Sequence, residues 1–309
     1  MTSSDGAGKV VPLAEAIARD VPDGSSVVMG TALEALIPFA AGHEIIRQGT
    51  RDLTLIGPIS DILFDQLIGA GVVNRLRVAW VGNVSEGLGH NYRRARERAL
   101  PHPLEVEPYS NLTVSLGLLA AALGAPYIPT YSLLGTDILR ENPSLRAGIG
   151  PFGEPIVRVP AIRPDVAILH VQRADAGGGA HAWGNLGVTR EAFLAARRVI
   201  LTTEEIVPSD VIRSDPNRVL GPPHKVSAVV HVPGGAHPSP VQGYYNRDHA
   251  FFRDYHQETR SAEGWRRWLE EWVLSVPGRD AYLEKLGAER WEALRPKKSL
   301  CAAPVDYGY

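Results

Sequence analysis

Apolar runs that suit buried strands alternate along this chain with segments of helical pattern, and no other sequence feature constrains the fold as much. The candidate strands are residues 26–29, 53–56, 76–81, 104–107, 166–171, 199–203 and 226–232. Several of these runs are continuously apolar, which is typical of strands covered on both faces. The candidate helices between them are residues 33–47, 61–70, 91–100, 111–123 and 190–197. We therefore predict an α/β fold with an open, mostly parallel sheet and helices on both faces.

The chain of 309 residues is long enough for one large α/β domain. We expect a single domain over residues 1–295, in which residues 246–295 form a C-terminal helical extension, and a tail at 296–309. Within the extension, the helical spacing of Trp265, Trp268 and Trp272 predicts one apolar helix face that packs in the core or against another subunit.

Composition and charge exclude several classes of partner. The net charge of -2 provides no broad basic field, so we expect neither nucleic acid nor a membrane surface as a partner. The single cysteine, Cys301, cannot form an internal disulfide, which fits a reducing compartment. The first residues lack a basic and then apolar leader, and no apolar run approaches the ~20 residues that cross a membrane. We therefore expect a cytoplasmic protein.

The familiar cofactor and metal motifs are missing from the sequence. It contains no phosphate-binding loop and no dinucleotide fingerprint. The histidines are scattered, and without paired cysteines they suggest no metal site. A serine-hydrolase elbow is also absent, because Asn83 stands where the first glycine of that motif would be. We expect no tightly bound cofactor.

The glycine-rich segment 82–90 follows a predicted strand and precedes an arginine-rich helix. Ligands of open α/β sheets bind beyond the carboxyl ends of the strands. Glycines permit close approach of backbone amides, which can bind an oxyanion or a carboxylate. Asn83, Ser85, Glu86 and Gly87 are therefore candidate substrate-binding residues. The alternative interpretation is a glycine-rich turn followed by a solvated helix.

Ser110 and Asn111 follow another predicted strand and are a second pair of candidate substrate-binding residues. Either residue suits a helix N-cap, which would direct the positive end of the helix dipole towards the mouth of the sheet. Capping alone explains them equally well. The segments 133–137 and 170–175 are further candidates, as a closing loop and as a polar strand end, whereas His237 in its proline-rich turn favours a structural role.

Several of these segments match one enzyme family in order along the chain. The chain resembles the A (α) subunit of class I CoA-transferases, in particular the glutaconate CoA-transferase-like group. The resemblance extends from about residue 20 to 287, and its matching runs are 43–49, 82–94, 109–111, 132–137, 170–175, 183–184, 197–200, 204–207, 235–238 and 243–245.

This resemblance implies that the partner is a B (β) subunit, in an α2β2 or higher hetero-oligomer whose active site lies between the two kinds of subunit. It implies that coenzyme A is a substrate, moved between an acyl-CoA and a small carboxylic acid. The nucleophile would be a glutamate of the B subunit, which carries CoA as a thioester during the reaction. This chain would then supply walls, oxyanion donors and acyl-group contacts.

Two positions depart from the family pattern. Glu86 stands where the pattern has a small residue, and Gly179 stands where Asn is common. A carboxylate at position 86 can repel a carboxylate substrate, act as an accessory base or point away from the site. One alternative is therefore a ring-opening CoA-thioester hydrolase subunit with the same fold, of the kind that degrades steroids. A second alternative, from another class, is a non-catalytic ligand-binding subunit, because one fold hosts unrelated functions.

Overall fold

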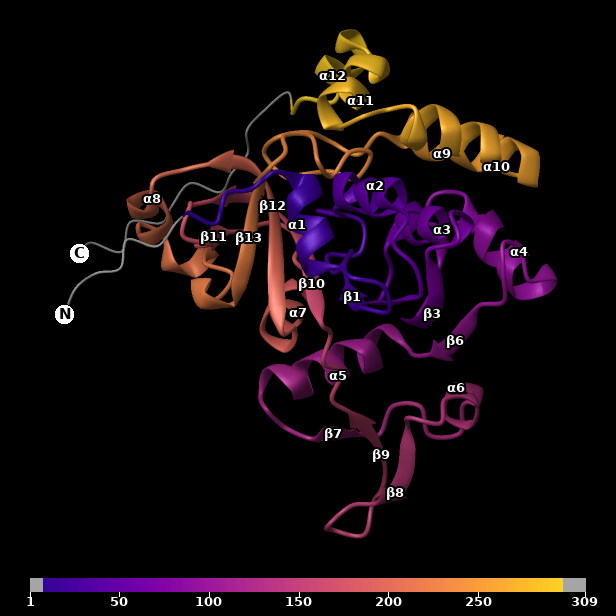
Figure 1. Ribbon diagram of the computed structural model, residues 1–309. Coiled ribbons are helices and arrows are strands. Elements are labelled where there is room, and N and C mark those ends of the chain that lie inside the picture. The colour runs from indigo at the N-terminus through magenta and orange to yellow at the C-terminus, as the bar shows by residue number, and fades with distance from the viewer. Residues whose placement is uncertain (1–7, 297–309) are drawn as a thin grey trace.

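Parallel strands form the centre of the computed structural model, which describes residues 8–296 (Figure 1). They are β1 (Ser26–Val28), β2 (Leu53–Gly57), β3 (Val73–Val78), β6 (Glu105–Pro108), β10 (Val166–Ala174), β12 (Arg198–Ile206) and β13 (Val226–His231). Their order in the sheet is β13-β12-β10-β1-β2-β3-β6, and every neighbouring pair is parallel. Among the described strands, the short β11 (Ala180–His181) alone joins this sheet antiparallel, against β10. The predicted open, mostly parallel sheet is confirmed.

Helices cover both faces of this sheet, as predicted. The helices up to β12 are α1 (Leu13–Asp20), α2 (Phe39–Gln48), α3 (Asp61–Gly69), α4 (His90–Arg98), α5 (Asn111–Ala122), α6 (Asp137–Glu141) and α7 (Thr189–Ala195). Side chains of α1, α2 and α3 share one core with Val27, whereas α5 and α7 share the other with Val28. Consecutive strand residues thus enter opposite cores, which explains why these strands are apolar throughout.

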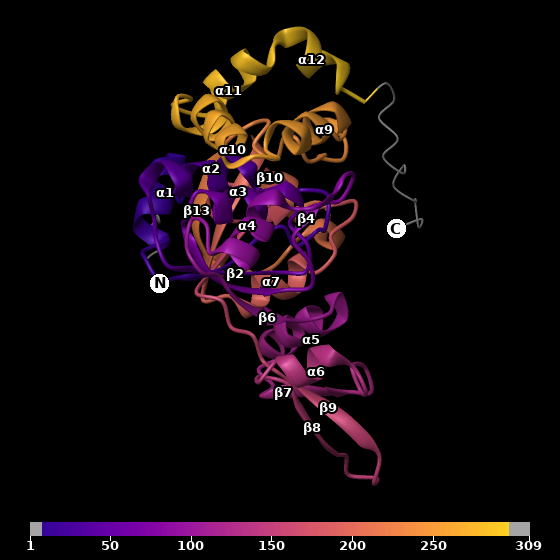
Figure 2. The same cartoon turned by 90° about the vertical axis from the view of Figure 1, so that its right-hand side faces the viewer.

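The later part of the chain forms a group of helices across one end of the molecule (Figures 1 and 2). After α8 (Ser209–Arg213) and two short 3-10 turns at Pro216–Arg218 and Pro223–Lys225, they are α9 (His249–Glu258), α10 (Ala262–Leu269), α11 (Arg279–Leu286) and α12 (Ala288–Ala293). Trp265 and Trp268 stack with ring centroids 5.7 Å apart and lie in the same core as α2 and α3. The predicted tryptophan face is therefore core packing, although the regular helix ends at Leu269 and continues as a wider π-type turn, Glu270–Leu274.

An antiparallel arm, which the sequence did not predict, projects from the opposite end of the molecule (Figure 2). Its strands are β7 (Tyr127–Thr130), β8 (Arg146–Ile149) and β9 (Pro155–Pro160), in the order β7-β9-β8. Prolines bound or interrupt two of these strands, and proline weakens the sequence signal of a strand. Phe152 lies in the turn between β8 and β9 and is 93% exposed.

Two predicted boundaries were wrong, for reasons visible in the packing. The strand predicted at 76–81 lies earlier, at Val73–Val78, because Arg75 and Arg77 face outwards and pair with Glu105 and Glu107 of β6. The helix predicted at 33–47 begins only at Phe39, directly after Pro38, which is the late start that proline favours. Within residues 8–296, no helix is both long and apolar enough to cross a membrane.

Candidate active site at the carboxyl edge of the sheet

The sheet has a topological switch point between β1 and β10, from which its two halves extend in opposite directions. Ligands of open α/β sheets bind at such points, beyond the carboxyl ends of the strands. The backbone here is strained: Leu33, Leu36 and Asp61 have φ values of 67°, 54° and 43°. Side chains other than glycine rarely adopt this conformation, and such strain concentrates at functional sites. This edge of the sheet is therefore the candidate active site.

The segment predicted as the centre of the site forms a small hairpin after β3. Its strands are β4 (Gly82–Asn83) and β5 (Gly87–Leu88), which pair antiparallel. Both glycines are required by the geometry, because a Cβ on Gly82 would lie 2.6 Å from the carbonyl oxygen of Gly87, and Gly87 has φ 112°. We refer to residues 82–88 as the β4–β5 hairpin.

The hairpin separates its predicted site residues into a buried root and an exposed tip. Asn83 is only 1% exposed, and its side chain donates a 2.6 Å hydrogen bond to the carbonyl oxygen of Phe252 in α9. Its side-chain oxygen also accepts from the Ser85 amide at 3.1 Å. Ser85, Glu86 and Gly87 are exposed at the tip. Asn83 is thus placed to hold the hairpin on α9, and the other three residues are placed to meet a ligand or a partner.

Ser110 and Asn111, the second predicted pair, lie at the start of α5. Ser110 and Thr113 form a reciprocal capping box, in which each side chain accepts from the backbone amide of the other residue. Asn111 is exposed. In the part of the chain that the structure describes, no hydrogen bond or ion pair joins this pair to the β4–β5 hairpin. The capping interpretation accounts for Ser110, and Asn111 remains a candidate contact.

Asp61 and Arg247, which the sequence analysis did not single out, meet at the hairpin. Arg247 lies in the segment before α9, and its guanidinium forms a 2.7 Å ion pair with Asp61 at the start of α3. It also donates to the hydroxyl of Ser85 at 3.2 Å. Asp61 accepts from the backbone amide of Val84 at 3.2 Å. An acidic residue at the first position of the helix that follows the buried strand β2 was the one sequence signal that marked Asp61.

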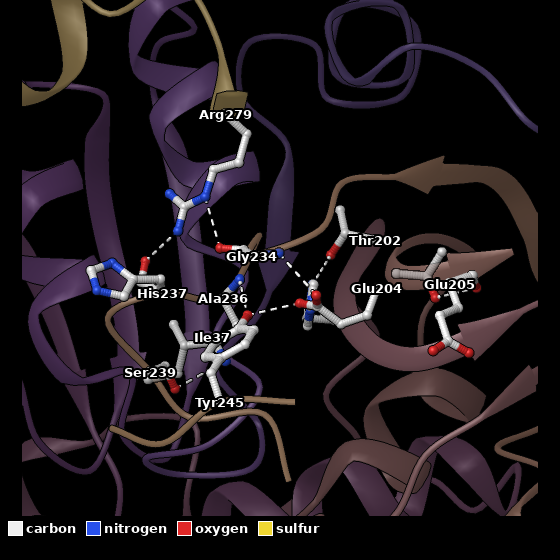
Figure 3. Close-up of polar contacts among 12 residues, drawn as sticks. Ile37, Thr202, Glu204, Glu205, Gly234, Ala236, His237, Ser239, Tyr245 and Arg279 are labelled. Atoms are coloured by element: carbon white, nitrogen blue, oxygen red, sulfur yellow. Dashed lines mark hydrogen bonds and ion pairs between the residues drawn. The ribbon is translucent and has the colours of Figure 1, made fainter. Parts of the chain in front are cut away.

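Glu204 is the centre of a second polar cluster, which lies beside β10, β12 and the loop after β13 (Figure 3). The carboxylate accepts from His170 at 2.7 Å, from the Tyr245 hydroxyl at 2.8 Å and from the Gly234 amide at 2.9 Å. Burial alone would raise the pKa of Glu204, but these donors lower it below its usual value. His170, a predicted polar strand end, thus belongs to a buried network, which we call the Glu204 network.

His237 lies next to this network and is fully buried. Its ring contacts the Tyr282 hydroxyl at 2.9 Å and Asp248 at 3.1 Å, and Arg290 also binds Asp248. Burial lowers the pKa of His237 to about 4, so its ring is neutral at pH 7. Figure 3 also shows Arg279 donating to the carbonyl oxygens of Gly234 and His237. The predicted structural role of His237 agrees with this setting.

The arginines after the hairpin line a groove of about 340 Å³ between α4 and the start of α10. Arg93 pairs with Glu97 at 3.1 Å, and Arg94 donates to the carbonyl oxygen of Thr259. These two arginines therefore have partners within the chain. Across residues 8–296, no group of three or more His, Cys, Asp or Glu side chains is placed to hold a metal ion.

Comparison with known proteins gave consistent matches over most of the chain. The family model described as Coenzyme A transferase matches residues 10–231. The A subunit of 3-oxoadipate CoA-transferase from Pseudomonas knackmussii is 40% identical over 266 residues, which are 86% of this chain and 93% of that protein. The A subunit of glutaconate CoA-transferase from Acidaminococcus fermentans is 34% identical over 91% of this chain and 93% of its own length.

Structural similarity extends over the same length. The crystal structure of glutaconate coenzyme A-transferase from Acidaminococcus fermentans superposes with a TM-score of 0.87, covering 93% of this chain and 96% of that chain at 33% identity. A weaker match is the cholesterol ring-cleaving hydrolase IpdA subunit of Mycobacterium tuberculosis, which is 28% identical over 82% of this chain and 89% of its own length.

Proposed function

This chain belongs to the coenzyme A transferase family and is an A subunit of class I. From that premise we propose that it works with a B subunit to move CoA between an acyl-CoA and a small carboxylic acid. The observation that carries the proposal is the nearly full-length agreement, in sequence and in fold, with A subunits of named CoA-transferases. The exposed tip of the β4–β5 hairpin would form one wall of a site that the B subunit completes.

We propose a dicarboxylic acid as the substrate class. The two relatives above act, by their names, on 3-oxoadipate and glutaconate, which are both dicarboxylic acids. The hairpin tip would contact the acid through the amides and the hydroxyl of its exposed residues. Assays with glutaconate, 3-oxoadipate and succinate against acetate test this proposal, and equal rates with acetate would contradict it.

The nucleophile of the proposed reaction is a glutamate of the B subunit. Its carboxylate attacks the acyl-CoA carbonyl, which forms a mixed anhydride and releases the CoA thiolate. The thiolate then attacks the glutamyl carbonyl of the anhydride, so that the first acid leaves and a glutamyl-CoA thioester remains. The incoming acid reverses these steps and regenerates the free carboxylate.

The buried carboxylates of this chain support a nucleophile on the partner. Glu204 accepts hydrogen bonds from three neighbours, and Asp61 pairs with Arg247. Glu204 is a poor nucleophile because its donors already stabilise its charge, and Asp61 is fully buried, where an acyl-CoA carbonyl cannot reach it. Glu86 is exposed and belongs to the hairpin tip, where we propose an accessory role for it.

Trapping the intermediate tests the mechanism. The full chain, co-purified with its B subunit, would be mixed with an acyl-CoA and then reduced with borohydride. Reduction of a glutamyl thioester on the B subunit, with loss of activity, is the expected result. Acyl-CoA turnover that incorporates oxygen from heavy-oxygen water, without any trapped thioester, would contradict transfer.

That second outcome would favour the ring-opening hydrolase. The specific observation in its favour is Glu86, a carboxylate on an exposed hairpin tip where it can reach water. The match to the ring-cleaving hydrolase, at 28% identity, is weaker than the matches to the transferases at 34% and 40%. Transfer is therefore the better-supported function.

A further inference from the structure

Arg247 connects three segments that leave the carboxyl edge of the sheet. Besides its contacts with Asp61 after β2 and Ser85 after β3, its Nη1 lies 3.7 Å from the Glu34 carboxylate after β1. The guanidinium stacks over the Phe252 ring of α9 at 3.6 Å from its centroid, and the side chain is only 8% exposed. A residue in the chain segment before α9 thereby reaches the loops that follow β1, β2 and β3.

Asp61 holds the same hairpin from the other side. Its residue is fully buried, and one carboxylate oxygen accepts from the Val84 amide while the other faces Arg247. Its backbone has φ 43°, a conformation that costs free energy in any residue with a side chain. Two buried side chains thus bind consecutive residues of the hairpin: Asp61 binds the Val84 amide, and Arg247 binds the Ser85 hydroxyl.

The charges show that this cluster is not a receptor for a substrate anion. Two carboxylates, those of Asp61 and Glu34, already face the single guanidinium of Arg247. A further carboxylate would meet a neutral or negative cluster. A buried ion pair also adds little to stability, because desolvation offsets much of its attraction. The pair instead fixes the relative positions of the groups around it, because a planar guanidinium binds several acceptors at once in one geometry.

We propose that Arg247 and Asp61 are positioning residues that clamp the tip of the β4–β5 hairpin over the mouth of the active site. Arg247 fixes the Ser85 side chain, and Asp61 fixes the Val84 amide. The clamp itself is a property of this chain, and its effect on catalysis rests on the proposed transferase function. Releasing it lets the hairpin open, so that the acid substrate is held less well.

Acid weakens this clamp. The pKa of Asp61 is raised to about 6, because burial, and to a smaller extent the nearby Glu34 carboxylate, outweigh the opposing effects of Arg247 and the Val84 amide. Below that pH, Asp61 takes up a proton and its attraction to Arg247 falls. An Asp61→Asn variant mimics this state while keeping an acceptor for Val84, and asparagine tolerates positive φ. The variant therefore separates the charge from the backbone strain.

Amide hydrogen exchange of residues 82–88 in the full chain, alone and with its partner, tests the clamp without reference to activity. We expect exchange to rise about tenfold in Arg247→Ala and less in Arg247→Lys, whose single ammonium cannot serve both Asp61 and Ser85. Arg253→Ala, an exposed arginine of α9, is the matched control and should leave the hairpin unchanged. Unchanged exchange in folded Arg247→Ala and Arg247→Lys would overturn the clamp.

Kinetics with the partner present tests the link to catalysis. We expect Arg247→Lys and Asp61→Asn to raise KM for the acid more than they lower kcat, with kcat/KM falling about tenfold or more. An acid limb near pH 6 in the wild type should disappear in Asp61→Asn, which general loss of packing would not produce. A loosened hairpin with unchanged kinetics would overturn the positioning role. A hairpin that is loosened in the variants, together with a wild-type complex that lacks transferase activity, would support the clamp and contradict the transferase.

Discussion

The Glu204 network and the β4–β5 hairpin both lie near the carboxyl ends of strands in one sheet. The carboxylates that they contain differ in burial and in hydrogen bonding. Glu204 is buried among three hydrogen-bond donors, whereas Glu86 lies exposed on the tip of the hairpin. A buried, fully bonded carboxylate fixes the loops around it, and an exposed one is available to a substrate. Two glutamates that look alike in the sequence thus have different roles: Glu204 stabilises the loops in one half of the sheet, and Glu86 is a candidate substrate contact in the other.

The largest expected effect is on stability, from removing the centre of the network. Glu204→Ala leaves His170, Tyr245 and the Gly234 amide without their acceptor, and breaking a buried pair of this kind costs about 3–5 kcal/mol. Glu205→Ala is the matched control, because its side chain is 43% exposed and its ion pair with Arg173 lies at the surface. That change should cost less than ~1 kcal/mol.

Urea unfolding of both variants, followed by tryptophan fluorescence, measures the difference. A Glu204→Ala midpoint equal to that of Glu205→Ala would mean that the network does not hold this half of the molecule together.

The buried histidines beside the network predict the next largest effect, a loss of stability in acid. Burial lowers the pKa of His43 to about 3 and that of His237 to about 4, below the ordinary 6.5 of the unfolded chain. Each therefore contributes stability that is complete above pH 6.5 and is lost as the pH falls towards those values. The cost is about 1.4 kcal/mol per pH unit for each proton that only the unfolded chain binds.

Asp61 acts in the opposite direction, because its folded pKa of about 6 lies above the ordinary 3.8. Its contribution to stability is complete below pH 3.8 and is lost as the pH rises through 6. Asp65 and Glu258, whose pKa values burial also raises, act in the same direction as Asp61, whereas His90, whose pKa is lowered to about 4, acts with the two histidines. The contribution of His43 is therefore measured as a difference: as the pH falls from 6 to 4.5, the wild type should lose more of its free energy of unfolding than His43→Gln does. An equal loss in the two proteins would refute the assignment.

Asn83 and Ser85 allow a buried, hydrogen-bonded residue to be compared with an exposed one within the hairpin itself. Asn83→Ala removes a buried hydrogen bond to the Phe252 carbonyl oxygen of α9, at a cost of about 0.5–1.5 kcal/mol. Ser85→Ala, at the exposed tip, should stay within ~0.5 kcal/mol of the wild type. Thermal unfolding of the two variants distinguishes root from tip, and similar melting temperatures would contradict the division.

Sequence patterns predicted the sheet because its strands are buried on both faces and read as unbroken apolar runs. They failed where a strand carries charge, as in β3, whose Arg75 and Arg77 pair with the edge strand β6. The arm was missed because its strands are short and bounded by proline. In both places the strand is only partly buried, so the hydrophobic pattern that reveals secondary structure is weak.

The candidate site was predictable only in part. The hairpin follows a strand and contains glycines, so local sequence marked it. The clamp and the network were not marked, because their members are distant in sequence: His170 and Glu204 are 34 positions apart, and Ser85 and Arg247 are 162 apart. Such pairs form only when the topology brings the ends of strands together. A single sequence does not show which loops beyond the sheet lie next to each other.

The smallest expected effect on stability comes from Glu86, and it tests the functional half of the comparison. Glu86→Gln removes the charge of an exposed side chain and should change the free energy of unfolding by less than ~0.5 kcal/mol. Its effect should instead appear in substrate choice. A carboxylate at the tip repels the free carboxylate of a dicarboxylic acid, so the variant should favour dicarboxylic over monocarboxylic acids about three- to tenfold more than the wild type does.

Salt distinguishes this repulsion from a change of shape. The Debye length falls from about 10 Å at 0.1 M to about 3 Å at 1 M ionic strength, so the difference in acid preference should shrink as salt is added. Measuring kcat/KM for glutaconate and for acetate at both ionic strengths makes the comparison. An altered preference that persists in 1 M salt would mean that position 86 acts through packing. An unchanged preference at low salt would remove Glu86 from the site and leave the hairpin with its amides and Ser85 as the groups that meet the acid.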